Sequence, residues 1–169
     1  MKNRFTKIWL IVLVAVLISP NCYPQAKRIA FLPFQNMDGN FALNIYCYQL
    51  QDSLTKAFLS IDSEGKSYHV VPADSVDMLL AEMNLDPNNP QYATDMWKAA
   101  KLLAVEYVIT GNFNMQAKRL LINAYIYDVN TKLPDPDYQA RDIFKKEEQV
   151  MSAVPVMVRQ LIKYFIPAN

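Results

Sequence analysis

The chain has 169 residues, and its 17 basic and 16 acidic side chains give a formal net charge of +1. This near balance argues against a nucleic-acid-binding groove, which would need a basic stripe. The three glycines are far apart, so the chain has no glycine-rich phosphate-binding loop, and His69 is a lone histidine, which excludes a histidine-pair metal site.

The first residues have the organisation of a secretory signal. Three basic residues precede an unbroken apolar run at residues 8–18. This run is too short for a transmembrane helix, which needs about 20 residues. We predict that residues 1–26 are a signal peptide, with an uncertain cleavage site, and that residues 27–169 form one exported α/β domain. An uncleaved N-terminal anchor is the alternative.

Two cysteines need separate interpretations. Cys22 is a candidate for lipidation, although residues 19–21 are Ser-Pro-Asn, where a lipobox has a leucine followed by small residues. The alternative of a membrane-anchored lipoprotein subunit therefore stays open. Cys47 occupies an apolar position in a helical pattern, which favours a small buried hydrophobic residue over a nucleophile or half of a disulfide.

The hydrophobic pattern predicts five strands and four helices. Residues 28–34 are nearly all apolar, which indicates a central strand covered on both faces that ends near Pro33. A turn over residues 35–40 follows. The further strands are expected at residues 68–71, 107–115, 119–129 and 138–144, and the helices at 43–61, 74–83, 90–103 and 150–165.

Local signals mark the ends of three of these helices. Asp74 is expected to cap the second helix, and Pro90 to be the first residue of the third. Pro155 predicts a kink or a delayed start in the last helix. Within the first helix, Gln51 and Thr55 fall on the polar side of the pattern.

The order of these elements predicts the topology. Right-handed crossovers place the first three strands in parallel, with the first in the middle, and short connections add the last two as antiparallel neighbours. The predicted fold is a single α/β domain with a mixed five-stranded sheet of order 2-1-3-4-5 and about four helices packed on it.

No catalytic constellation is visible, but four residues define an alternative function. Asp135 and Asp137 flank a proline, and paired carboxylates can act as general acid and base or bind calcium. Solvated turn residues explain the same pattern and are the favoured interpretation. With Asp128 and His69, they are the residues that an exported hydrolase or small-ligand binder would use. Such a protein should bring several polar side chains to one end of the sheet.

A surface is the stronger candidate site. In the strand at 119–129, alternation places Asn123, Tyr125 and Tyr127 on one face, and the neighbouring strand offers Asn112. If helices cover only the opposite face, these aromatic and amide side chains suit a protein contact. A face that is solvated or covered by the last helix explains the same pattern and is the favoured interpretation.

Three phrases resemble a known group of envelope domains. They are Ile-Ala-Phe-Leu-Pro-Phe-Gln-Asn at residues 29–36, Val-Glu-Tyr-Val-Ile-Thr-Gly at 105–111 and Ala-Tyr-Ile-Tyr-Asp-Val-Asn-Thr at 124–131. The group comprises the TolB amino-terminal region, CsgG-type curli-secretion lipoproteins, FlgO-type flagellar proteins and LpoB-type activators of penicillin-binding proteins. Lys132 departs from the pattern, since a glycine usually stands there.

The resemblance implies a non-enzymatic protein without a cofactor. It would be periplasmic or associated with the outer membrane, and it would help to assemble, regulate or secrete through an envelope machine. Its partners would be envelope proteins, a homo-oligomer stays open, and contact with a membrane would run only through an N-terminal anchor. The chain is too short for the long strands of a curli-type pore, and no propeller repeats follow as in TolB.

Overall fold

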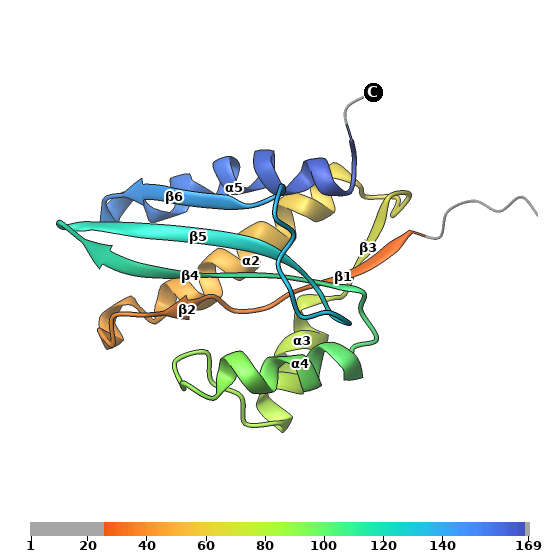
Figure 1. The fold of residues 1–169 in the computed structure, drawn as a ribbon, viewed down its shortest axis with the longest axis horizontal. Helices are drawn as coiled ribbons and strands as arrows, with labels where there is room; N and C mark the ends of the chain where they lie inside the picture. Colours follow the sequence, from red (N-terminus) through yellow and green to blue (C-terminus); the bar gives the residue numbers. More distant parts are fainter. Residues whose placement is uncertain (1–25, 168–169) are drawn as a thin grey trace, which may run out of the picture.

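The computed structural model describes residues 26–167, so Cys22 and nearly all of the predicted signal peptide lie outside the described residues. Helices pack on both faces of one six-stranded sheet (Figure 1). The strands are β1 (Lys27–Phe31), β2 (Gln35–Asn36), β3 (Tyr68–Val70), β4 (Tyr107–Gln116), β5 (Arg119–Asp128) and β6 (Ala140–Lys145). The α-helices are α2 (Ile45–Ile61), α3 (Ala73–Glu82), α4 (Tyr92–Leu102) and α5 (Val154–Leu161), and the 3-10 segments are η1 (Phe41–Leu43), η2 (Glu147–Ala153) and η3 (Ile162–Tyr164). Among the described helices, none combines the length and apolar character needed to cross a membrane.

The strands lie in the order β3-β1-β4-β5-β6, and β2 pairs with β4. Counted over the five predicted strands, this is the order 2-1-3-4-5, so the predicted topology is confirmed. β1 is parallel to both β3 and β4, because helical crossovers return the chain to the same end of the sheet. β4, β5 and β6 are antiparallel neighbours. Ala117 and Lys118, both at positive φ, form the two-residue turn that joins β4 to β5.

The short strand β2 occupies the start of the turn that the sequence predicts over residues 35–40. Pro33 has no N–H to donate, so the chain leaves the sheet after Leu32, as the proline predicts. It returns two residues later, where Gln35 and Asn36 pair with β4 in parallel. The predicted turn is therefore shorter than expected, and β2 forms an edge of the sheet beyond the end of β1.

The interruption at Pro33 is fixed by contacts with two elements, β4 and α4. The Pro33 carbonyl accepts hydrogen bonds from the hydroxyl of Thr110 on β4, at 2.8 Å, and from that of Tyr92 on α4, at 3.4 Å. The buried ring of Phe34 lies so close to Gly111 of β4 that a Cβ atom on this glycine would be 2.5 Å from it. The Gly111 backbone is not left-handed, so glycine is required at this position for space and not for its conformational freedom.

Two hydrophobic cores lie on the two faces of the sheet. The larger core lies between the sheet and helices α2 and α5. The smaller core lies between β1 and helices α3 and α4, and includes Ala30, Leu32, Val76, Leu80, Met96, Ala99 and Val108. Figure 1 shows α3 and α4 together below β1, whereas the β4–β5 hairpin extends to the left of the view, away from these two helices.

Helix α2 buries more of its surface than the sequence predicts. Cys47 is buried, as expected, and burial raises the pKa of its thiol to about 11. Gln51 and Thr55, predicted on the polar side, are each only 3% exposed. Beyond the end of β3 the Phe31 carbonyl has no strand donor, and Gln51 Nε2 supplies one at 3.1 Å. The Thr55 hydroxyl donates to the Gln51 carbonyl at 2.8 Å, which satisfies the second buried group.

Two of the three predicted helix boundaries are wrong. Pro72 occupies the N-cap of α3, so Asp74 lies in the first turn, where its charge still suits the positive end of the helix dipole. Pro90 precedes α4, because the Asn89 side chain accepts the Gln91 N–H at 2.9 Å and adds a turn before the helix. The delayed start that Pro155 predicts is confirmed, since this proline lies in the first turn of α5 after the segment η2.

Asp62 holds the connection between α2 and β3. Its carboxylate accepts the backbone N–H groups of Lys66 at 3.0 Å, Ser67 at 2.6 Å and Tyr68 at 3.3 Å. Desolvation raises the pKa of Asp62, but these hydrogen bonds lower it by more, so that the net shift is downward. The ionised form therefore stabilises the folded state.

We expect Asp62→Asn to lower the free energy of unfolding at neutral pH, because asparagine cannot supply the charge that these donors stabilise. A lowered folded pKa gives stability that is complete above the unfolded value, about 3.9, and is lost as the pH falls through the folded value. Urea unfolding of both proteins at several pH values should therefore show a difference that shrinks in acid. A difference that is independent of pH would contradict this role of the charge.

Gly111→Ala is expected to destabilise the protein by about 1–3 kcal/mol or more, because the new methyl group would collide with the Asn123 carbonyl and the Phe34 ring. Gly39→Ala is the matched control, since nothing lies within 4 Å of its Cβ position and only its positive φ is strained. We expect the control to cost about 1–2 kcal/mol. Thermal and urea unfolding measure both values, and a larger loss in the control would contradict the packing assignment.

Candidate functional site

The side chains of β4 and β5 alternate between the two faces of the sheet. On one face, Leu120, Ile122, Ala124 and Ile126 are fully buried in the larger core. The other face carries five half-buried side chains at the hairpin end, where α3 and α4 do not extend. With Phe144 of β6, we call these residues the open face: Asn112, Asn114, Leu121, Asn123, Tyr125 and Phe144.

An amide pair lies at the centre of the open face. Asn112 and Asn123 are directly opposite in the β4–β5 register, and Asn123 Nδ2 donates to Asn112 Oδ1 at 3.0 Å. Asn123 Oδ1 accepts the backbone N–H of Asp142 at 2.9 Å. Asp142 has a φ of 57°, and the β5–β6 register shifts at this point. Asn123 therefore also satisfies the backbone of an irregularity in β6.

The two predicted tyrosines have different surroundings. Tyr125 lies opposite Thr110 in the open face, and its ring centroid is 5.8 Å from that of Tyr127. Tyr127 packs edge-on against Trp97 of α4, with centroids 5.6 Å apart, and belongs to the border of the smaller core. Burial, with a smaller contribution from Tyr125, raises the pKa of Tyr127. Tyr125 is therefore the more available contact residue of the two.

The far end of the open face is apolar. Leu121 of β5 lies opposite Phe144 of β6, whose side chain is 44% exposed. Phe144 was not singled out from the sequence, although it follows Ile143, which points into the larger core. Alternation along the strand could therefore have indicated an outward-facing aromatic residue.

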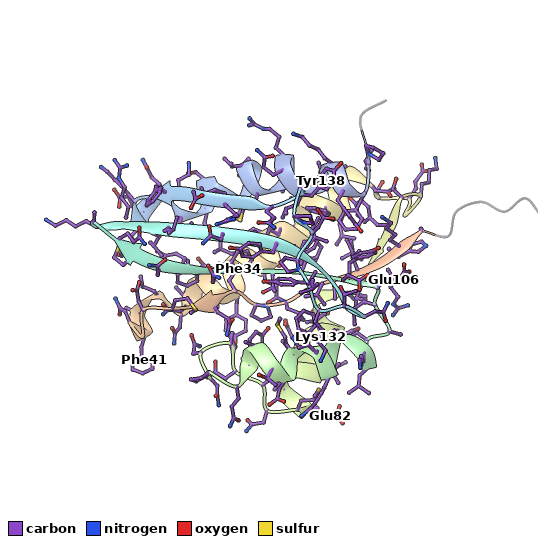
Figure 2. The ribbon with its side chains drawn as sticks, viewed as in Figure 1. Phe34, Phe41, Glu82, Glu106, Lys132 and Tyr138 are labelled. Atoms are coloured by element: carbon purple, nitrogen blue, oxygen red, sulfur yellow. The ribbon has the colours of Figure 1, made fainter. Side chains whose placement is uncertain are left out.

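A second exposed apolar group lies around the start of α2. Met37, Phe41, Ile45 and Tyr48 are between 47% and 83% exposed, and Phe41 projects from the surface in Figure 2, whereas Phe34 lies in the interior. A cavity of about 350 Å³ adjoins Met37 and is lined by Gln35, Asn36 and residues 87–90. Gln35 is the register partner of Asn112, so this cavity borders the open face.

The acidic residues of the alternative function come together in part. Asp128 and Asp135 line a cavity of about 310 Å³ with Tyr107, Ile126, Pro134 and Tyr164. Burial raises the pKa of Tyr164, and its hydrogen bond to Tyr107 and the negative charges of Asp135 and Asp128 raise it further. We call this cavity the acidic pocket. It lies on the α5 side of the sheet, away from the open face.

The other two residues of the alternative function lie elsewhere. Asp137 does not line the acidic pocket, and its backbone N–H donates to Asp135 Oδ1 at 2.9 Å. His69 is an exposed residue of the edge strand β3, next to Gly65. Within residues 26–167, no three histidine, cysteine or acidic side chains are grouped as a metal site would require.

The fold of this chain is similar to the folds of several solved structures. No protein-family model and no curated protein matches the sequence. The lipoprotein GNA1162 from Neisseria meningitidis is similar in structure, with 17% identity and a TM-score of 0.53 over 80% of this chain and 96% of that chain. The LpoB C-terminal domain from Salmonella enterica gives 12% identity and a TM-score of 0.51 over 80% of this chain and 93% of that domain.

The LpoB structure from E. coli gives 12% identity and a TM-score of 0.52 over 72% of this chain, and the match spans 58% of the LpoB chain. At these identities the similarity concerns the fold. The predicted resemblance to LpoB-type domains is thereby supported in three dimensions, and the chain has the fold that the LpoB C-terminal domain and the lipoprotein GNA1162 share.

Proposed function

We propose that this chain is an exported, non-enzymatic interaction domain of the cell envelope. It binds an envelope protein through the open face and the neighbouring edge at β2, and it assembles or regulates an envelope machine by this contact. The activity is the ordering of a partner, and turnover of a substrate is not part of it.

The observation that carries the proposal is the uneven cover of the sheet. Helices α2 and α5 cover one face, whereas α3 and α4 leave the hairpin end of the other face exposed. The open face combines an aromatic ring, paired amides and an apolar end formed by Leu121 and Phe144. Aromatic side chains with a polar end, surrounded by hydrogen-bonding groups, are the composition that protein interfaces favour.

The similar structures and a second exposed apolar group also support the proposal. The similar structures include a protein described as a lipoprotein and the LpoB C-terminal domain, and the LpoB-type resemblance implies binding to envelope proteins. The exposed apolar group at Met37, Phe41, Ile45 and Tyr48 extends the contact area beyond the open face. A group of exposed large apolar side chains is typical of interaction sites.

Site-specific photocrosslinking in intact envelopes tests the proposal. A benzophenone amino acid at Tyr125 is expected to give a discrete adduct with one envelope protein, because this side chain is the tyrosine of the open face. The same amino acid at Phe41 reports on the edge at β2. Met78 is the matched control, since it is 69% exposed on α3 and lies outside the proposed surface.

Adducts that form at Tyr125 and at Phe41, and not at Met78, would support the contact surface. If all three positions give the same adducts, the contact is non-specific. If neither Tyr125 nor Phe41 gives an adduct, this surface is not an interface and the proposed function fails.

Mutation of the two tyrosines should separate binding from stability. We expect Tyr127→Ala to lower the free energy of unfolding by about 1–3 kcal/mol, because it loses the contact with Trp97. Tyr125→Ala should cost less than about 1 kcal/mol and still weaken partner capture. Urea unfolding and the yield of the Phe41 adduct measure the two effects. Equal destabilisation by both variants would contradict the difference in packing.

A further inference from the structure

The acidic pocket offers a second binding site that the proposed function does not use. It lies where β4 begins and β5 ends, on the opposite face of the sheet from Tyr125. Its volume, about 310 Å³, is at the lower end of the range for small-ligand sites. Aromatic, aliphatic and proline side chains form most of its wall, so the pocket favours a ligand with apolar surface.

Two carboxylates give this wall a negative charge. Asp128 Oδ1 accepts the N–H groups of Asn130 and Thr131, and Asp135 Oδ1 accepts those of Asp137 and Tyr138, all at 2.8–2.9 Å. These bonds fix the carboxylates and leave Oδ2 of each without a backbone donor. Within the described part of the chain, no lysine or arginine nitrogen lies within 4 Å of either carboxylate.

The aromatic wall already holds a cation on its rings. Lys27 Nζ lies 4.1 Å from the ring centroid of Tyr164 and 5.2 Å from that of Tyr107. An ammonium group at such distances is attracted by the electron-rich face of the ring. The one charge of Lys27 does not balance those of Asp128 and Asp135.

We propose that the acidic pocket binds an organic ammonium group. Oδ2 of Asp128 and Oδ2 of Asp135 accept hydrogen bonds from its N–H groups, and the rings of Tyr107 and Tyr164 pack against its carbon chain. Charge-assisted hydrogen bonds and cation–π contact favour the same ligand chemistry. Either a free alkylamine or a lysine side chain of another polypeptide carries this group.

NMR titration of the domain tests the proposal with three probes, of which the free amine and the uncharged control are matched in size. n-Butylammonium represents a free amine, an acetylated Gly-Lys-Gly amide represents a lysine side chain, and n-butanol is the uncharged control. We expect saturable shifts at the amides of Tyr107, Asp128 and Asp135 with at least one ammonium probe and none with butanol. Saturation by both charged probes indicates recognition of the group itself, and saturation by one of them identifies the source.

Three variants complete the test. Asp128→Asn with Asp135→Asn keeps the Oδ1 acceptors of both turns and should weaken binding about tenfold or more. Asp137→Asn is the matched control and should bind as the unmodified protein does, because Asp137 lies outside the pocket. Lys27→Met removes the competing cation and should strengthen binding.

The proposal is overturned if butanol shifts the same amides equally, or if no ammonium probe saturates. It is also overturned if the double variant, shown to be folded by its spectrum, binds with unchanged affinity. Weaker binding to Lys27→Met would mean that Lys27 supports the ligand, which contradicts the assigned charge balance.

Discussion

The interruption of the first strand at Pro33 is the constraint on which the arrangement of this domain depends. Leu32 enters the smaller core and Phe34 the larger one, although residues two apart in a strand share a face, so the side-chain alternation crosses over at Pro33. Thr110 and Gly111 make this crossing possible, the first by a hydrogen bond to the Pro33 carbonyl and the second by leaving room for Phe34. Two of the three phrases that resemble LpoB-type domains therefore meet in space. The residues of these two phrases therefore have a structural role at the junction.

The same junction accounts for the asymmetry of the sheet. Tyr92 ties α4 to Pro33, so α3 and α4 are anchored at the end of the sheet where β1 and β3 lie. The β4–β5 hairpin continues beyond them, and no helix of residues 26–167 covers it on that side. Its outward side chains must then be compatible with water, and the Asn112–Asn123 pair meets this requirement. The exposed surface is thus a consequence of where the helices are anchored.

The sequence predicts the sheet order and the two faces of β5, because both follow from local periodicity and from crossover handedness. It does not predict β2, which depends on a register that opens only after the break at Pro33. Gln51 falls on the polar side of the helical pattern, and its burial follows from the early end of β3, which lies far away in the sequence. Asp128 and Asp135 lie seven residues apart, and only the loop that returns Asp135 N–H to the Ile126 carbonyl brings them together. In each of these cases the missing information is a contact outside the local periodic pattern.

The position of β1 has a mechanical consequence. The described chain enters the domain at Lys27 and becomes the strand that lies between β3 and β4, with parallel pairing on both sides. Tension applied ahead of Lys27 would act along this strand, so that the hydrogen bonds of both ladders would share the load and would have to break together. A pull from that direction is therefore resisted by the centre of the sheet, and force is transmitted directly to the junction at Pro33.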